Sequence, residues 1–283
     1  MPGPGKAWAV GNFINGKFHQ HTLIEHFDGA EWSVVPSLNP GALQNILYGV
    51  AAITDTDVWT VGAFQEANGL WRTLAEHWDG SRWLVVDTVD AGTHGNQFYA
   101  VKALASNNVY AIGQQANAAF PNQALIEHWD GISWAVVTSP ADASTALPLG
   151  ITATASALTV VGQQETDIAP YTSYVATGSP AALAIQPTPQ LGAGENDAFA
   201  VTIANDGTTW GVGWAIDPKT DLHNPLVLRG VHGTFSLVSV PNPFRGGDTG
   251  FAAITTVPGG GMWAVGGAAT STSNIRSFIE FHP

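Results

Sequence analysis

The sequence predicts an all-β fold, a six-bladed β-propeller built from four-stranded repeats of about 51 residues, and three observations support this prediction. A strand-like run that ends in Val-Gly or Ile-Gly recurs six times along the 283 residues. Each full repeat contains four short strand-like pieces. Glycine and proline, with 32 and 17 copies, are frequent enough to supply the many turns that such a fold needs.

The recurring run is clearest at Asp57-Val58-Trp59-Thr60-Val61-Gly62. Its closing glycine returns at positions 11, 62, 113, 162, 213 and 266. A period this regular is typical of a repeat architecture in which every unit packs on its neighbours. We therefore expect a single β-propeller domain over residues 1–283.

One repeat, residues 46–87, shows the order of the strands. An inner strand over 47–53 is small and apolar, the second strand is the recurring run, and a third strand covers 73–78. Asp79-Gly80 is a hairpin turn signal, because it supplies a residue that tolerates positive φ. The outer strand then covers 83–86.

The terminal repeats are predicted to be incomplete. The first lacks an inner strand and the last lacks an outer strand, which leaves 22 recognisable strands where six full blades need 24. Three explanations stay open: residues missing at the ends, two incomplete blades, or closure through a partner.

The third strand carries a second motif, Leu125-Ile126-Glu127-His128-Trp129-Asp130-Gly131, followed by Trp134. Together with the Val-Trp-x-Val-Gly run, this pattern resembles a bacterial tandem-repeat family of propellers that are often exported and mostly without assigned function. The resemblance covers nearly the whole chain. It implies the fold and says little about activity, because its motifs are structural parts of the blade.

Composition and charge exclude several classes of function. The formal net charge of −13 opposes binding to nucleic acid or to an anionic membrane surface, and no apolar run approaches the roughly 20 residues that a membrane-spanning helix needs. There is no cysteine, so disulfide and thiol chemistry are excluded. The polar start leads directly into a repeat strand, and we expect a secreted or cell-surface protein whose leader is not in this numbering.

The repeated Glu-His pairs at Glu25-His26, Glu76-His77 and Glu127-His128 could act as acid, base or metal ligand. They recur in step with the structural tryptophans, however. We therefore interpret them as structural hydrogen-bonding groups between strands or blades.

Residues that depart from the repeat are better candidates for a site. We expect them in the long, dissimilar loops of one face, above all those that join the second and third strands. Exposed aromatic and amide side chains there can stack on sugar rings or bind a protein surface. The predicted ligand-binding residues are Phe13, Phe64, Gln65, Trp71, Gln115, Gln164 and Trp214. For the two tryptophans, packing beneath their own loops is the alternative.

The rival hypothesis is an enzyme, a hydrolase, lyase or isomerase, with an acid-base pair drawn from Glu66, Glu165, Asp217 and His223. His19, His21 and His94 also depart from the repeat, but they lack the tight spacing of metal ligands, and we expect no metal and no cofactor. Asp217-Pro218-Lys219-Thr220-Asp221 is interpreted as a turn rather than a calcium loop. The favoured function is binding of a glycan or a protein surface, with a purely structural module as the third possibility; the oligomeric state is open.

Overall fold

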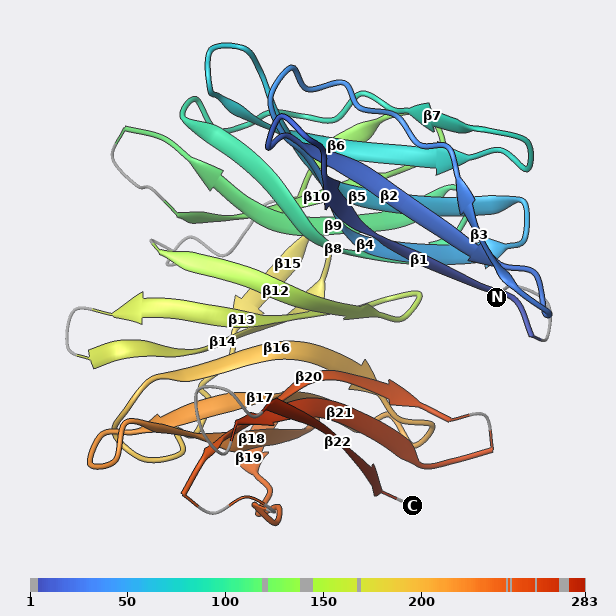
Figure 1. Cartoon of the computed structure of the whole chain (residues 1–283). Coiled ribbons are helices and arrows are strands. Elements are labelled where there is room, and N and C mark those ends of the chain that lie inside the picture. Colours follow the sequence, from blue (N-terminus) through green and yellow to red (C-terminus); the bar gives the residue numbers. More distant parts are fainter. Residues whose placement is uncertain are drawn as a thin grey trace. The chain divides into compact units, whose positions relative to one another are not determined.

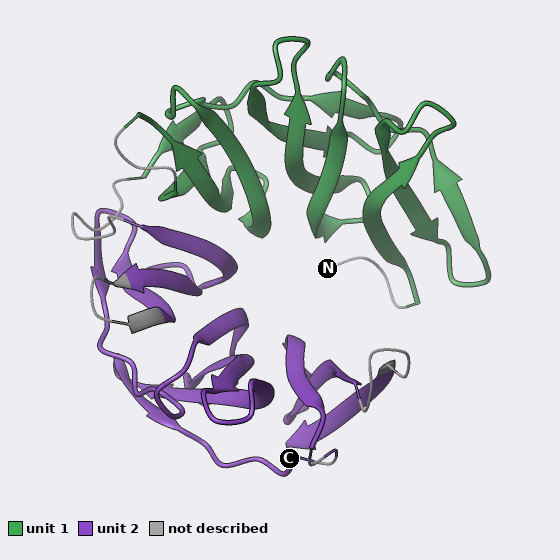
Figure 2. Ribbon diagram, turned by 60° about the vertical axis from the view of Figure 1, so that its left-hand side comes forward, with its two compact units in different colours: residues 1–139 green, residues 140–283 purple. Residues whose placement is uncertain are grey.

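A computed structural model describes residues 5–118, 122–137, 145–166, 169–242, 244, 246–257, 259–269 and 275–282. The chain divides into two compact units, residues 1–139 and 140–283 (Figure 2). All the regular elements in the described ranges are β-strands, and their sheets are antiparallel meanders (Figure 1).

Unit 1 contains three sheets, which we number as blades 1 to 3. Blade 1 comprises β1 (Ala7–Ile14), β2 (Gln20–Phe27) and β3 (Trp32–Val35). Blade 2 comprises β4 (Asn45–Thr54), β5 (Asp57–Gln65), β6 (Trp71–Trp78) and β7 (Trp83–Val85). Blade 3 comprises β8 (Gly95–Ala105), β9 (Asn108–Ala116), β10 (Gln123–Trp129) and β11 (Trp134–Val136).

Unit 2 contains blades 4 to 6. Blade 4 comprises β12 (Ala146–Ala153), β13 (Leu158–Thr166), β14 (Ala169–Ser179) and β15 (Ala182–Ile185). Blade 5 comprises β16 (Asn196–Ile203), β17 (Thr209–Asp217), β18 (Leu222–Val231) and β19 (Thr234–Leu237). Blade 6 comprises β20 (Asp248–Thr256), β21 (Met262–Ala269) and β22 (Ile275–His282).

The predicted fold class, an all-β six-bladed β-propeller, is confirmed. The described residues form 22 strands, with three in the first blade and three in the last. The missing strands are the predicted ones, because blade 1 starts at the second strand of the repeat and blade 6 stops at the third. A single domain over residues 1–283 stays a prediction.

The inner strand passes so close to the closing glycine of the repeat that no side chain would fit at this position. A Cβ added at Gly62 would lie 1.9 Å from the carbonyl oxygen of Ile46, and four other repeats show the same contact at 1.8 to 2.0 Å. Gly11 is the exception, with no atom within 4 Å of an added Cβ. Blade 1 has no inner strand among the described residues, which explains the exception.

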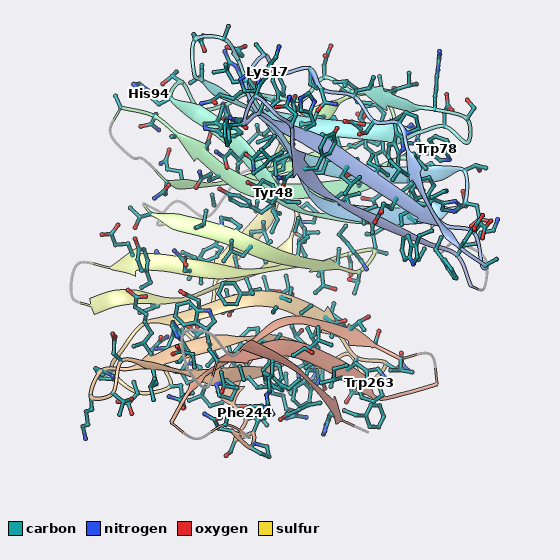
Figure 3. The ribbon with its side chains drawn as sticks, viewed as in Figure 1. Lys17, Tyr48, Trp78, His94, Phe244 and Trp263 are labelled. Carbon is teal, nitrogen blue, oxygen red and sulfur yellow. The ribbon has the colours of Figure 1, made fainter. Side chains whose placement is uncertain are left out.

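Every inner strand has a β-bulge beside this glycine, so one residue is left without a partner in the second strand. The bulged residues, in chain order, are Tyr48, Tyr99, Leu149, Phe199 and Ala252. The Tyr48 ring, labelled in Figure 3, packs edge-on to Tyr99 at 5.4 Å. Blade 6 has the smallest side chain at this position.

The Asp-Gly turn is formed as predicted. Oδ1 of Asp79 accepts hydrogen bonds from the backbone N–H groups of Ser81 and Arg82, at 2.8 and 3.0 Å. Gly80 has φ of +94°, a conformation that favours glycine. The hydroxyl of Ser81, which donates to the same oxygen at 2.6 Å, and these two backbone hydrogen bonds hold the pKa of Asp79 down to about 2.

The core of each unit lies between neighbouring blades. Trp83 at the start of an outer strand is buried against Trp8 of the preceding blade, with ring centroids 5.4 Å apart and planes at 88°. Trp134 repeats this contact against Trp59, at 5.4 Å and 86°. Trp78, labelled in Figure 3, joins the same layer. These contacts bury the largest side chains of the repeat and account for its tryptophan pattern.

The Glu-His pairs have structural contacts. Oε2 of the buried Glu76 accepts from the backbone N–H of Leu38 at 3.4 Å, and Oε2 of the buried Glu127 accepts from Val89 at 3.0 Å. Both donors belong to the segment that leaves the preceding blade. His77 stacks on Trp59 at 4.5 Å and its Nε2 lies 2.8 Å from Oδ1 of Asp57. The pairs therefore link strands and blades.

The described part of the chain contains no helix long and apolar enough to cross a membrane.

Candidate functional site

The candidate site that brings aromatic and charged side chains together lies in unit 2, in an open cavity of about 500 Å³ between blades 5 and 6, which we call the Trp214 cavity. Its lining is mostly apolar, with one histidine and one aspartate. The lining residues are Phe199, Trp214, His223, Asp248, Thr249, Gly250, Phe251, Ala252, Gly267, Ala268 and Ala269.

Departures from the repeat create this cavity. Asp197 and Trp214 are cross-strand partners in blade 5, whereas the corresponding pair in blade 6 is Gly250 and Gly267. Two glycines leave no side chain on that part of the blade 6 sheet. The small bulged Ala252 adds further space, since tyrosine holds the corresponding position in blades 2 and 3. The indole of Trp214 occupies part of the space, because a Cβ added at Gly250 would lie 2.9 Å from Cβ of Trp214.

The aromatic and charged groups of the cavity are in direct contact. Trp214 packs edge-on to His223 with ring centroids 4.2 Å apart, and it packs against Phe199 at 5.6 Å. Nδ1 of His223 lies 2.8 Å from Oδ1 of Asp248, and the backbone N–H of His223 donates to the same oxygen at 3.0 Å. These hydrogen bonds lower the pKa of Asp248, so this carboxyl group is an anionic acceptor at neutral pH.

A second carboxyl group, Asp197, is buried beside this cluster. It lies opposite Trp214 in the β16–β17 ladder, so the two side chains share one face of the sheet. Burial, and to a smaller extent the Glu195 carboxylate, raise the pKa of Asp197 to about 6 against the opposing effect of His223. Oδ1 of Asp197 is buried without a hydrogen-bond partner.

Of the residues predicted from the sequence, only Trp214 and His223 line this cavity together. The other predicted ligand-binding residues lie at the ends of second and third strands in other blades. Phe13 is exposed and stacks on His21 at 5.5 Å. Phe64 packs into the core between blades 1 and 2. Trp71 lies against the start of β8, since a Cβ added at Gly95 would be 3.7 Å from Cβ of Trp71.

The predicted amide residues contact their own hairpins. Nε2 of Gln65 donates to the carbonyl of Gly69 at 2.8 Å, and Nε2 of Gln115 donates to that of Ala124 at 3.5 Å. Gln164 pairs with Thr172 in the β13–β14 ladder. Each of these three amides thus lies in a hairpin of a different blade.

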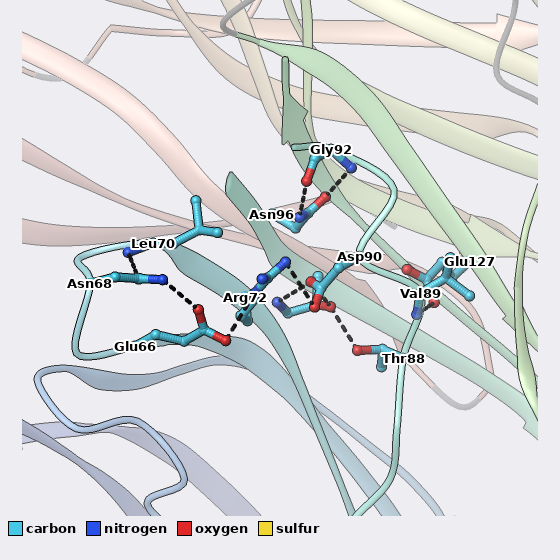
Figure 4. A network of polar contacts seen from close by, with 11 residues as sticks. Glu66, Asn68, Leu70, Arg72, Thr88, Val89, Asp90, Gly92, Asn96 and Glu127 are labelled. Atoms are coloured by element: carbon cyan, nitrogen blue, oxygen red, sulfur yellow. Dashed lines mark hydrogen bonds and ion pairs between the residues drawn. The ribbon is translucent and has the colours of Figure 1, made fainter. Parts of the chain in front are cut away.

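The three predicted catalytic carboxylates belong to three different blades. Glu66 is paired with Arg72 at 3.2 Å, and Arg72 reaches Asp90 at 3.5 Å (Figure 4). The exposed Glu165 lies at the end of β13 and its backbone N–H donates to the carbonyl of Thr145 at 3.1 Å. Asp217 lines a separate cavity of about 560 Å³ that also includes Lys219 and Asn224.

The turn at Asp217 has the predicted form. Oδ1 of Asp217 accepts a hydrogen bond from the backbone N–H of Lys219 at 2.9 Å, so this side chain stabilises its own turn. Within the described ranges, no group of three or more histidine, aspartate and glutamate residues is arranged to hold a metal ion.

The expectation that the predicted site residues lie in loops was wrong. Phe13, Trp71 and Trp214 belong to β1, β6 and β17, because the hairpin ladders continue several residues beyond the Val-Gly corner. Polar, aromatic and aliphatic side chains are mixed there, so the alternation that reveals a half-buried strand in the sequence is absent. The true links are short; that between β17 and β18 spans only residues 218–221.

The sequence interpretation missed Asp248, Asp197, Gly250 and Ala252. Comparison of the repeats with one another could have identified these residues. At the position of Ile46 and Gln97, the fifth repeat has the charged Asp197 and the sixth has Gly250. A charged residue followed one repeat later by a residue without a side chain marks a site between the two blades.

Comparison with known proteins supports the fold and no closer relationship. No protein-family model matches the chain, and no curated protein matches it. Among solved structures, YCF48 bound to a D1 peptide is similar, with 14% identity, 96% of this chain and 77% of that chain covered, and a TM-score of 0.55. An α-L-arabinanase of Penicillium chrysogenum complexed with arabinobiose is 12% identical, with 92% and 84% covered and a TM-score of 0.55. YjhT is 10% identical, with 91% of each chain covered and a TM-score of 0.53. At these identities the likeness shows the β-propeller fold alone.

Proposed function

We propose that this protein is a ligand-binding β-propeller and that the Trp214 cavity binds a glycan. The observation that carries the proposal is the position of the Trp214 indole in a cavity opened by the Gly250–Gly267 pair, beside the charged Asp248. A concave, mostly apolar site with a few fixed polar groups is the usual form of a small-molecule site.

The lining suits the chemistry of a sugar ring. Such a ring has apolar C–H faces and hydroxyl groups along its edge. Trp214 and Phe199 offer aromatic surfaces for the faces, and the Asp248 carboxylate can accept from hydroxyl groups. Asp248 is held in place by two hydrogen bonds from His223, so little side-chain entropy is lost when a ligand binds.

A protein ligand is the other form of the binding hypothesis. Both classes of ligand occur among the similar structures, a D1 peptide on YCF48 and arabinobiose on the arabinanase. The glycan is favoured here because a cavity of about 500 Å³ fits one or two sugar rings better than a protein surface.

Two arrays test the class of ligand. The labelled protein is applied to an array of plant and bacterial oligosaccharides and, in parallel, to an array of overlapping peptides. Specific binding to a set of related oligosaccharides supports the proposal. Binding only to peptides contradicts the glycan assignment, and binding to neither contradicts the binding function.

A second candidate function, glycoside hydrolysis, is favoured by Asp197. A carboxyl group with a pKa of about 6 can donate a proton near neutral pH, and Asp248 supplies a second, ionised carboxylate. Incubation of the glycans bound on the array with the native protein and with Asp197→Asn tests this hypothesis. Turnover that is lost in Asp197→Asn while binding persists would show an enzyme; no turnover by the native protein would leave a binding protein.

A further inference from the structure

A second cavity in unit 2 lies beside β18 of blade 5, next to the β17–β18 turn. Its volume is about 560 Å³, and we call it the Asn224 cavity. Residues of the turn, two residues of β18 and the segments before and after blade 5 line it. The outer strand β19 pairs only with residues 228–231 of β18, so it does not cover this part of the blade.

Two other blades have a polar contact at this place. In blade 2, the hydroxyl oxygens of Thr73 and Thr88 lie 2.7 Å apart, and the backbone N–H of Thr73 donates to Oδ1 of Asp90 at 3.2 Å. In blade 1, the hydroxyl oxygens of Thr22 and Ser37 lie 2.7 Å apart in the same way. The contact ties the third strand to the segment that leaves the blade.

Blade 5 has lost both members of this pair. Counted from the closing glycines and along the ladders, Pro225 is the counterpart of Thr73, and Val240 is the counterpart of Thr88. Proline has neither an N–H group nor a hydroxyl group, and valine has no hydroxyl group, so the contact cannot form. Both side chains line the Asn224 cavity and give it an apolar floor.

A third replacement opens the space above this floor. In blade 2, Arg72 fills the corresponding place, with Nε 3.2 Å from Oε1 of Glu66 and Nη1 3.5 Å from Oδ2 of Asp90 (Figure 4). Its counterpart in blade 5 is Asn224, which follows from the ladders in the same way. Asparagine is much shorter than arginine, so the place of the guanidinium group is left open in blade 5.

The Asn224 cavity is adjacent to the Trp214 cavity. Asn224 lines one cavity, and the preceding residue, His223, lines the other. Asn242 lines the Asn224 cavity, and its Oδ1 accepts from the hydroxyl of Thr249, which lines the Trp214 cavity, at 3.1 Å. One hydrogen-bonded pair of side chains and one step along β18 therefore separate the two cavities.

We propose that the Asn224 cavity is a second subsite of the glycan site, so that the ligand is a linear oligosaccharide that extends from the Trp214 cavity into it. This inference rests on the proposed function. Pro225 and Val240 can pack on the C–H face of a sugar ring, and the Asn224 amide and the Asp217 carboxyl group can bond its hydroxyl groups. A cavity of this size holds roughly one or two rings, so the complete site takes a chain longer than a disaccharide.

The dependence of affinity on chain length tests the proposal. Cello-, xylo-, arabino- and chito-oligosaccharides of two to six sugar residues are titrated into the native protein by calorimetry. In a series that binds, we expect the affinity to rise roughly 10-fold or more from the disaccharide to the tetrasaccharide. The tetrasaccharide, unlike the disaccharide, should also slow hydrogen exchange in residues 217–224 and 238–242.

Each other outcome of these titrations overturns the second subsite. Affinity that stops rising at the disaccharide, or exchange that the tetrasaccharide leaves unchanged in these segments, would do so while glycan binding by the Trp214 cavity stands. Absence of binding in all four series would also do so, and the oligosaccharide and peptide arrays then decide the proposed function separately.

A variant locates the added sugar residues. Asn224→Arg gives blade 5 the side chain that fills this place in blade 2, with Asp217 four residues after the closing glycine where blade 2 has Glu66. We expect the ratio of tetrasaccharide to disaccharide affinity, measured within each protein, to fall to below about 3. Ser236→Arg, exposed in the same blade and outside both linings, should keep the native ratio.

Thermal melts establish that both variants are folded. A native ratio in folded Asn224→Arg would overturn the proposal. If this variant does not fold, hydrogen exchange in the native protein decides.

Discussion

Trp214 packs edge-on to His223, with ring centroids 4.2 Å apart and ring planes at 82°. The contact joins two strands of blade 5, and His223 in turn holds Asp248 of blade 6. The Trp214 ring and the anionic carboxyl group of Asp248 thus lie on the same wall of the Trp214 cavity.

Gly250→Ala should damage the site without unfolding the protein. The added Cβ would lie 2.9 Å from Cβ of Trp214, so the indole must move. We expect at least 10-fold weaker glycan binding, measured by titration calorimetry. Gly16→Ala is the matched control, since no atom lies within 4 Å of its added Cβ. Unchanged affinity in Gly250→Ala would show that the position of Trp214 does not matter.

Ala252→Tyr should fill the cavity with the side chain that two other repeats have at this bulge. Tyr48 and Tyr99 show that the backbone of an inner strand accepts tyrosine here. We expect binding to be lost while the free energy of unfolding changes by no more than about 1 kcal/mol. Full affinity with a stable fold would place the ligand elsewhere.

The closing glycine should be needed only where an inner strand covers it. Gly62→Ala forces a contact of 1.9 Å with a backbone oxygen, and we expect a loss of roughly 2 kcal/mol or more in urea denaturation. Gly11→Ala meets no atom within 4 Å, so its stability should stay within about 0.5 kcal/mol of the native protein. Equal losses in the two variants would contradict this explanation of the repeat.

Stability should fall as the pH rises through neutrality because of two buried glutamates. Burial raises the pKa of Glu76 to about 7 and that of Glu127 to about 8. Between the ordinary glutamate pKa and these values, the folded state keeps protons that the unfolded state releases, so alkali favours unfolding. Their stabilising effect is complete at low pH and disappears above pH 8.

Glutamine variants test this pH dependence. Glu76→Gln and Glu127→Gln should match the native protein at pH 5 and exceed its free energy of unfolding at pH 9 by on the order of 3 kcal/mol each. The exposed Glu31→Gln should leave the slope unchanged. A native protein that becomes more stable from pH 5 to pH 9 would refute the assignment.

Much of the fold could be predicted from the sequence, because the signals are local and repeated. The recurring glycine marks the second strand of every blade, the Asp-Gly turn marks the last hairpin of blades 1 to 3, and the incomplete first and last blades follow from counting. Trp214 and His223 could be picked out because they depart from the repeat. Each of these inferences needs only residues close together in the chain.

The partners of Trp214 could not be predicted because they depend on long-range register. Asp248 meets His223 only through packing of β20 against β18, across 25 residues. Asp197 has a raised pKa only because the fold buries it. The size of the cavity depends on Gly250, which faces the Trp214 indole of the preceding blade, and on its cross-strand partner Gly267, and no local pattern contains that relationship.

Titration calorimetry of the best oligosaccharide from the array, with the native protein, Trp214→Ala and Trp32→Ala, tests the central claim most directly. Trp32 is exposed in blade 1 and lies outside the Trp214 cavity. The account predicts saturable binding by the native protein and by Trp32→Ala and at least a 10-fold loss in Trp214→Ala. Native affinity in a folded Trp214→Ala would contradict the account.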